Sequence, residues 1–380
     1  MRLYEYEGAD LFRRESIPIP EFALAASPAE ARAKAAEIGL PVVLKAQVLT
    51  GGRWLAGGVQ VARTLNDVDA AAARIFGAPI RGFSVQQVMV ARQIESAREY
   101  YLGVTLDDYR GTPVAILSAQ GGVAINQTAQ ENPEVVVRQP VAISRGLQRQ
   151  QARHMCREAG LPAAEQSGVA EILTSLYRVF ANYDALVAEI NPLARTADGS
   201  LVALDSKVEI DDSSLFRHPD LHLSVEGRLA NPLERKGREI GVTYVELDGD
   251  IAIIASGAGL GMASMDVISQ KLRPANFLET GGAITADLLY KVMGLVLEKP
   301  GIRGIFINIY GGINPIHEGA KGIARYLQEH PLSIPIVAKA LGNHQEETWE
   351  VFRASGIHVT GGVSTEEGVD ELVRLLGAKG

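Results

Sequence analysis

Two carboxylates and one amide lie in a stretch that otherwise has the pattern of a β-hairpin. Residues 187–193 and 201–207 are short, mainly apolar runs that flank an Asp-Gly step, which supplies the positive φ of a tight turn. Alternation along the first strand places Glu189 and Asn191 on one face, and Asp205 shares that face from the return strand. An amide oxygen and a carboxylate that converge are hard ligands, which Mg²⁺ accepts while phosphates and water complete its shell. These residues alone leave an exposed hairpin face as an equal alternative.

A glycine-rich segment earlier in the chain has the composition of a phosphate-binding loop. The apolar run 42–48 leads into a loop with four glycines, and the strand pattern resumes over 59–61. Glycines let backbone N–H groups approach a polyphosphate closely, and Lys45 and Arg53 would supply positive charge. A flexible hairpin is the alternative, but Lys45 stands inside an apolar strand, where a charge without a counter-ion is costly. Glu99, which begins a later strand, is either a solvated acid or a hydrogen-bond acceptor for a ribose or base.

The second half of the chain alternates short apolar runs with helical stretches, which is typical of a doubly wound parallel sheet. The runs are residues 251–255, 276–278, 305–309, 335–338 and 357–359. Ligands bind at the carboxyl ends of such strands, where this chain has Ser256-Gly257-Ala258-Gly259 and Gly311-Gly312-Ile313-Asn314. The first turn opens a helix, whose free N–H groups and dipole predict an anion site. A dinucleotide fingerprint competes, but Met262 stands where a third glycine is expected.

Composition narrows the class of protein. A chain of 380 residues with 47% hydrophobic and 22% charged residues predicts two or three globular domains. The net charge of −8 argues against nucleic acid as a partner. No apolar run is long enough to cross a bilayer and the first residues lack a signal-peptide pattern, so we expect a cytoplasmic protein without a membrane partner. The single Cys156 has no matched His or acid nearby, and we interpret it as a core residue.

The elements that must position these residues are mixed in the first half, which we assign to the α+β class. We expect helices over residues 3–14, 28–39, 66–75, 147–159 and 164–183, and strands over 42–48, 59–61, 84–90, 99–107 and 113–118. The pattern loosens over residues 229–237, which we interpret as a linker. The predicted domains are therefore 1–237, with 21–100 as a subdomain, and an α/β domain over 238–380.

Five motifs, taken in order, resemble the β subunit of ADP-forming succinate–CoA ligases over the whole chain. They are the glycine-rich hairpin, Glu189-Ile190-Asn191-Pro192-Leu193 with Leu204-Asp205, Leu215-Phe216-Arg217-His218-Pro219-Asp220-Leu221, Gly257-Ala258-Gly259-Leu260, and Asn308-Ile309-Tyr310-Gly311-Gly312-Ile313. The resemblance implies an ATP-grasp fold followed by a flavodoxin-like CoA-ligase domain. It also implies an α subunit that carries a phosphohistidine and the CoA site.

The resemblance implies a role for each candidate residue. Lys45 and the loop at Gly52, Arg53 and Trp54 would hold the phosphates of ATP, with GTP possible, and Glu99 would contact the nucleotide. Asn191 and Asp205 would bind Mg²⁺, and Glu189 would orient the partner's catalytic histidine. The helix that begins near Gly257 and Gly259 would help to hold the phosphorylated histidine beside the substrate. Ser256 would face the carboxylic acid together with Gly311, Gly312, Ile313 and Asn314. None of the seven histidines stands in a Gly/Ala-rich loop, and His317 is the one nearest the substrate turn.

The chain departs from the family pattern at two places. The family's Gly-Gly-Arg-Gly-Lys is Gly51-Gly52-Arg53-Trp54-Leu55 here, which removes one positive charge and one glycine beside the phosphates. The substrate turn continues into Asn314-Pro315-Ile316-His317, and Lys339 replaces an arginine. We therefore hypothesise a polar relative of succinate, such as malate, as the acid; drift without a change of substrate is the alternative. An ATP-grasp carboxylate–amine ligase and a nucleotide-impaired regulatory subunit are competing interpretations.

Overall fold

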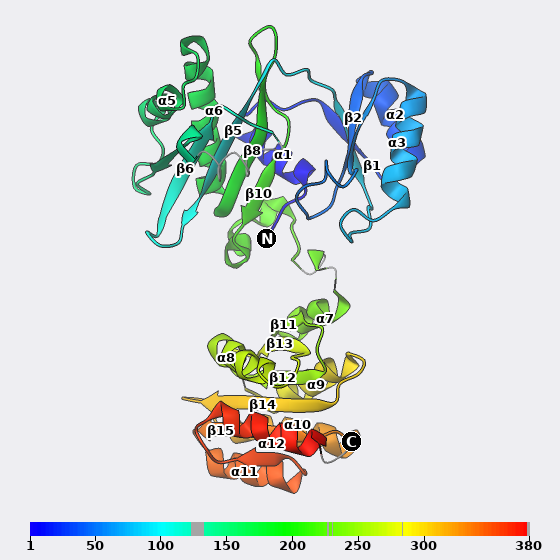
Figure 1. Ribbon diagram of the computed structural model, residues 1–380, viewed down its shortest axis with the longest axis vertical. Helices are drawn as coiled ribbons and strands as arrows, with labels where there is room; N and C mark the ends of the chain where they lie inside the picture. The colour runs from blue at the N-terminus through cyan, green and yellow to red at the C-terminus, as the bar shows by residue number, and fades with distance from the viewer. Residues whose placement is uncertain (123–132, 226–227, 230, 283, 378–380) are drawn as a thin grey trace. The chain divides into compact units, whose positions relative to one another are not determined.

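The computed structural model describes residues 1–122, 133–225, 228–229, 231–282 and 284–377 (Figure 1). The chain divides into two units, Met1–Leu223 and Ser224–Gly380. Each unit has its own hydrophobic core. Within the described ranges, no helix combines the length and the apolar character that a membrane span requires.

The first unit begins with helix α1 (Glu5–Arg14) and contains a four-stranded antiparallel sheet. The strands lie in the order β1 (Phe22–Ala25), β4 (Val88–Arg92), β2 (Val42–Ala46) and β3 (Val59–Ala62). Helices α2 (Pro28–Ile38) and α3 (Leu65–Gly77) pack on this sheet. The Ser27 and Thr64 hydroxyls cap them by accepting hydrogen bonds from the backbone at Glu30 and Asp67, as such residues do at helix N-termini.

A second, six-stranded antiparallel sheet completes the first unit, with the order β10-β8-β5-β6-β7 and β9 paired to β8. Its strands are β5 (Arg98–Asp107), β6 (Thr112–Ser118), β7 (Val136–Pro140), β8 (Ala185–Arg195), β9 (Leu201–Ala203) and β10 (Lys207–Ile210). Helices α5 (Arg149–Glu158) and α6 (Ala163–Asn182) lie beside this sheet in the same unit (Figure 1). Apolar side chains of α6 share one core with those of one face of the sheet. That face is apolar: Leu102, Ala188 and Ile190 are fully buried in the core. Alternation therefore leaves Tyr101 and Glu189 on the opposite face.

The second unit is a doubly wound sheet whose five parallel strands follow the order β13-β12-β14-β15-β16, with β11 antiparallel at one edge. The strands are β11 (Thr243–Glu246), β12 (Ile251–Ala255), β13 (Asn276–Glu279), β14 (Gly304–Gly311), β15 (Ile336–Gly342) and β16 (His358–Thr360). This is the flavodoxin-like order, whose switch point lies between β12 and β14.

Helices cover both faces of this sheet. Side chains of α8 (Ala258–Ser269) and α12 (Thr365–Gly377) pack with Ile251 and Phe306 on one face. Those of α9 (Ala286–Glu298), α10 (Ile316–Glu329) and α11 (Gln345–Ala354) pack with Ile254 and Ile307 on the other. The strands are consequently apolar at nearly every position, as expected for a sheet buried on both sides.

Most predicted elements are present, and three predictions differ from the structure. The linker expected over 229–237 is wrong for residues 232–237, since helix α7 (Pro232–Ile240) occupies them; residue 230 lies outside the described residues. The units meet at Leu223 and Ser224, earlier than the predicted domain boundary at 237. The strand expected over 201–207 is interrupted, because residues 204–206 leave the ladder between β9 and β10 and contact other parts of the unit.

Candidate functional site

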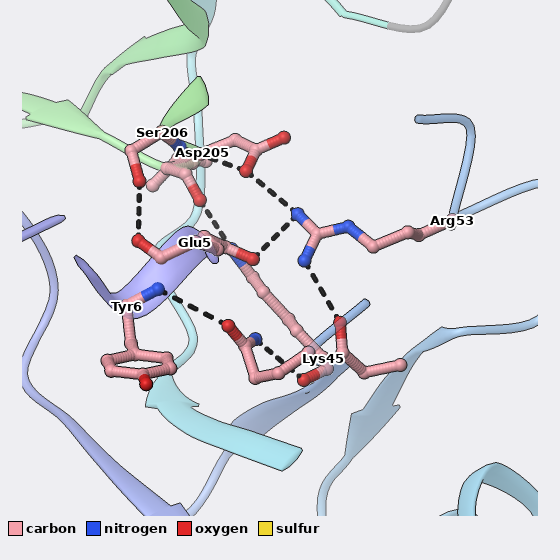
Figure 2. A network of polar contacts seen from close by, with 9 residues as sticks. Glu5, Tyr6, Lys45, Arg53, Asp205 and Ser206 are labelled. Atoms are coloured by element: carbon pink, nitrogen blue, oxygen red, sulfur yellow. Dashed lines mark hydrogen bonds and ion pairs between the residues drawn. The ribbon is translucent and has the colours of Figure 1, made fainter. Parts of the chain in front are cut away.

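Four charged side chains from distant parts of the first unit form one network (Figure 2). Glu5 lies between the two cations: its Oε1 is 2.7 Å from Lys45 Nζ, and its Oε2 is 2.7 Å from Arg53 Nη2. Arg53 Nη2 also donates to Asp205 Oδ1 at 3.0 Å, and its Nη1 donates to the Ala46 carbonyl at 3.0 Å. The predicted phosphate cations are therefore brought together with a predicted metal ligand.

The local fold explains how these side chains meet. Gly52 has φ +67°, a conformation that favours glycine, and the turn there directs Arg53 inward. Helix α1 approaches the β9–β10 connection closely: the Ser206 hydroxyl donates to the Glu5 carbonyl at 2.6 Å, and a Cβ on Gly8 would lie 2.8 Å from Ser206 Oγ. Lys45 also donates to the Leu204 carbonyl. The network consequently joins α1, β2, the glycine-rich loop and the connection after β9.

Burial and the neighbouring charges shift the pKa values of Glu5, Arg53 and Asp205. Burial raises the pKa of Glu5, but Lys45 and Arg53 outweigh this effect, so the pKa lies below its ordinary value. Burial lowers the pKa of the Arg53 guanidinium, and the two carboxylates Glu5 and Asp205 more than reverse this, so Arg53 stays charged. Burial, followed by the negative charge of Glu5, raises the pKa of Asp205. Asp205 still exposes 39% of its side chain, whereas Glu5 exposes 3%. Asp205 is thus the carboxylate that a ligand can reach.

The strand register supports the predicted pair of metal ligands. Leu193 lies opposite Ala203 in β8–β9, and Glu189 lies opposite Lys207 in β8–β10. Continuity between these pairs places Asn191 opposite Asp205. The β5–β8 ladder is irregular at this level, since the register shifts between Tyr100 and Leu102. The two predicted metal ligands therefore come from facing positions of β8 and of the connection between β9 and β10.

The oxygen atoms available at this point fit Mg²⁺. Asp205 Oδ1 accepts from Arg53 and from the Ser206 N–H, which leaves Oδ2 for a cation. Asn191 Oδ1 accepts from the Gly122 N–H at 2.7 Å and has a second lone pair. Within the described ranges no three His, Cys, Asp or Glu residues form a metal cluster. A site with two protein oxygens suits Mg²⁺, which retains waters and takes phosphate oxygens as ligands.

Glu189 and Glu99 lie along the same face of the six-stranded sheet. Glu189 accepts a hydrogen bond from Lys207 at 3.1 Å and exposes 20% of its side chain. Burial and the charge of Glu189 raise the pKa of Tyr101. Glu99 accepts from the Ser96 hydroxyl at 2.8 Å, and its other carboxylate oxygen lies 3.0 Å from where a Cβ of Gly122 would stand. Glu99 and Asn191 therefore meet at the same backbone segment, while Glu189 lies farther along β8.

The departure from the glycine-rich pattern lies on the outside of the loop. Trp54 is 56% exposed and Leu55 is 73% exposed. The loop closes through backbone hydrogen bonds from Gly57 to Trp54 and from Gly58 to Arg53. The two substituted positions thus leave the inward contacts of Arg53 intact. Trp54 is exposed and is not one of the four residues of the charged network.

The candidate acid site of the second unit lies at the carboxyl ends of β12 and β14. Ser256 Oγ accepts a hydrogen bond from the Tyr310 N–H at 2.9 Å and donates to the Tyr310 carbonyl at 3.3 Å, which ties the two strand ends together. Gly257 caps α8, and neither it nor Gly259 has an atom within 4 Å of a built Cβ, so the N-terminus of α8 is uncrowded.

The turn after β14 is closely packed at its first glycine only. A Cβ on Gly311 would lie 2.4 Å from Ile316, whereas one on Gly312 would meet nothing closer than 3.9 Å. Ile313 is 90% exposed, and the Asn314 amide lies beside Gly282. The turn therefore presents exposed backbone next to Ser256 at the switch point, where such folds bind ligands.

His317 lies at the start of α10, beside this turn. Its ring is 4.6 Å from the ring of His344, and its Nε2 lies 3.0 Å from Glu318. No glycine-rich loop presents it. The contact with His344 could not be predicted from the sequence, because the two residues follow different strands.

Comparison with known proteins agrees with these two units. An ATP-grasp domain model matches residues 2–195, and a CoA-ligase model matches residues 254–378. The chain is 42% identical to the β subunit of an ADP-forming succinate–CoA ligase from Chloroflexus aurantiacus, over 91% of this chain and 92% of that protein. It belongs to the succinate–CoA ligase β-subunit family.

Other relatives extend this assignment. A GDP-forming succinate–CoA ligase β subunit from Thermus thermophilus is 40% identical over 94% of this chain and 95% of its own. Among solved structures, an ATP citrate lyase from Methanothrix soehngenii matches with a TM-score of 0.78, covering 98% of this chain and 99% of that one. At 19% identity this match shows a shared fold. The ATP-grasp and flavodoxin-like expectations for this family member are thus confirmed.

Proposed function

We propose that this β subunit forms an acid–CoA ligase with an α subunit, using ATP and Mg²⁺ to convert a small dicarboxylic acid to its CoA thioester. The observation that carries the proposal is the network that holds Lys45 and Arg53 beside Asp205. Two cations and a reachable carboxylate are what a nucleotide polyphosphate and its metal ion need. We expect the complex to be cytoplasmic.

The first unit would bind the nucleotide and position its terminal phosphate. Lys45 and Arg53 would neutralise the phosphate charge, and the loop at Gly52 would bring backbone N–H groups near it. Asp205 and Asn191 would hold Mg²⁺, whose positive charge would neutralise part of the negative charge of the phosphates when it is bound. Glu99 would contact the nucleotide. Glu189 would accept a hydrogen bond from the partner's histidine and orient the imidazole for phosphorylation.

The second unit would serve the later steps. A carboxylate is a poor electrophile, so it must take the phosphoryl group from the partner's histidine before a thiol can displace phosphate. Gly257 and Gly259 leave the N-terminus of α8 open, and its N–H groups would stabilise the transferred phosphate. Gly311, Gly312, Ile313 and Asn314 would face the acid, and Ser256 would hold that turn to the end of β12. CoA would bind through the partner.

Co-expression with the α subunit, followed by ADP release over a panel of carboxylic acids with and without CoA, tests the proposal. ADP release that continues beyond one equivalent per complex only when an acid, CoA and Mg²⁺ are all present supports it. A clear preference for succinate would favour unchanged specificity, and a preference for malate or another polar acid would support the altered-acid hypothesis. Comparing ATP with GTP identifies the nucleotide.

The same assay separates the competing interpretations. Release of ADP by the isolated chain when an amine acceptor is present would favour a carboxylate–amine ligase. Failure to bind any nucleotide would favour a regulatory subunit. The outward position of Trp54 and Leu55, with Arg53 still directed inward, supports nucleotide binding.

A further inference from the structure

Glu5 is the most deeply buried acid among the residues that the structure describes, and it faces two cations with different oxygens. Its Oε1 contacts Lys45 and its Oε2 contacts Arg53, both at 2.7 Å. The carboxylate therefore sets the spacing between an ammonium and a guanidinium that come from a strand and from a loop. Figure 2 shows Glu5 between Lys45 and Arg53, on the α1 side of the network.

The position of Glu5 is fixed from its own helix. The Ser206 hydroxyl donates to its backbone carbonyl at 2.6 Å, and Gly8, one turn on, lets α1 lie against Ser206. The next residue is also held, because the Tyr6 N–H donates to Gln47, whose amide donates in turn to the Lys45 carbonyl. The Glu5 carboxylate is thus attached to an anchored backbone.

Both cations keep donors for a ligand while they contact Glu5. An ammonium has three N–H groups, and Lys45 uses two of them for Glu5 and the Leu204 carbonyl. A guanidinium has five, and Arg53 donates two of them, to Asp205 and to the Ala46 carbonyl, while its contact with Glu5 is an ion pair at 2.7 Å. Glu5 therefore holds the two side chains without exhausting their capacity to bind phosphate.

Asp205 has two competing uses in this network. In the structure it is a partner of Arg53, and in the proposed function it is a ligand of the metal ion. Arg53 can release it at low cost only if another carboxylate remains in contact with the guanidinium. Glu5 is that carboxylate.

We propose that Glu5 is a positioning residue that holds Lys45 and Arg53 at the phosphate site and thereby frees Asp205 for the metal ion. This inference rests on the proposed function. It adds a residue that touches neither nucleotide nor metal and acts through the two cations.

Calorimetric titration of the full chain with ADP, in the presence and absence of Mg²⁺, tests the inference. The variant is Glu5→Gln, and the matched control is Asp10→Asn, which removes the same charge from the exposed face of α1. Glu5→Gln should lower the affinity for metal-free ADP less than the affinity for MgADP, because the loss of a negative charge beside the phosphates offsets part of the lost positioning of Lys45 and Arg53. The factor by which Mg²⁺ increases the affinity for ADP should be smaller by about tenfold or more in this variant, because Asp205 stays paired with Arg53 and is not available to the metal ion. Asp10→Asn should match the wild type.

A purely structural role would weaken binding equally in both conditions, and that result overturns the inference. An unchanged Mg²⁺ effect in Glu5→Gln also overturns it. If Glu5→Gln does not fold, Glu5→Asp decides: a shorter carboxylate cannot reach both cations, so part of the Mg²⁺ effect should be lost, and wild-type behaviour would refute the proposal.

The measurement needs neither acid nor CoA, so it separates the two proposals. If the chain binds MgADP but forms no thioester together with its partner, the proposed function is wrong. The comparison of Glu5→Gln with the wild type still tests the role of Glu5 in that case. A wild-type chain that shows no Mg²⁺-dependent binding overturns the Glu5 inference as well.

Discussion

Replacing Asp205 with asparagine is the substitution that most directly separates metal binding from folding. The amide has the shape of the carboxylate and can still accept from the Ser206 N–H, but it carries no charge. Since Asp205 exposes 39% of its side chain, its contact with Arg53 is screened by water and should contribute about 0.2–1 kcal/mol. For a unit of this size, the melting temperature should fall by at most about 2–4 °C. The variant should therefore fold.

The effect on the metal should be much larger. Loss of a group that only supports a metal ligand typically costs about 10–100-fold in affinity, so loss of a charged ligand should cost at least about tenfold. A tenfold loss corresponds to about 1.4 kcal/mol. Metal-free ADP should bind no more weakly, because the variant removes a negative charge beside the phosphates.

Titration of wild type and Asp205→Asn with ADP, at several Mg²⁺ concentrations, measures both effects, and thermal unfolding provides the folding control. The reasoning predicts that the Mg²⁺-dependent gain in affinity disappears while metal-free binding is kept. A variant that keeps the wild-type gain would refute the assignment of Asp205 as a metal ligand. Equal losses with and without Mg²⁺ would show that Asp205 acts through Arg53 instead.

Three further predictions concern other parts of the chain. Glu189→Ala should leave nucleotide affinity within about twofold and slow phosphorylation of the partner's histidine at least about tenfold, because Glu189 pairs with Lys207 and not with the charged network; rapid-quench phosphorylation of the complex measures this. Cys156 should not react with a thiol reagent at pH 8 until the protein unfolds, because the residue is fully buried and burial raises the pKa of its thiol to about 11. Gly311→Ala should destabilise the second unit by about 1–3 kcal/mol through a clash with Ile316, measured by denaturant unfolding.

Each of these has a result that would contradict it. Wild-type phosphorylation by Glu189→Ala would exclude a role at the partner's histidine. Labelling of Cys156 in the native protein at the rate of a free thiol would show that α5 opens readily. Gly312→Ala is the control for Gly311, since its Cβ meets nothing closer than 3.9 Å, and equal destabilisation by both would refute the packing argument.

The hairpin could be predicted from the sequence because the residues that determine its strands and its turn lie close together in the chain. Alternation along β8 and an Asp-Gly turn predict which residues face each other, and the observed pairs on either side, Leu193 with Ala203 and Glu189 with Lys207, have the register that would place Asn191 opposite Asp205. Helix α7 was missed although Asn231 caps it, Pro232 begins it and Gly241 ends it in the left-handed conformation. Those signals are ordinary helix boundaries, and the polar, glycine-containing middle of α7 concealed them.

Glu5 could not be identified in the same way. An acid in the first turn of a helix is common because it favours the helix dipole, so its type and position are unremarkable. Its burial depends on Lys45 and Arg53, which lie far along the chain, and on the contact of α1 with Ser206. The order of the parallel strands in the second unit is likewise a property of tertiary packing.

The alternation of the six-stranded sheet also has a consequence for how this protein can evolve. Ala188 and Ile190 bury their side chains in the core, while their neighbours Glu189 and Asn191 occupy the opposite face. A substitution at an odd position of this part of β8 changes charge and ligand geometry without opening a cavity. A substitution at an even position changes the stability of the core. New specificities can therefore be sampled on one face of the sheet while selection for folding acts on the other.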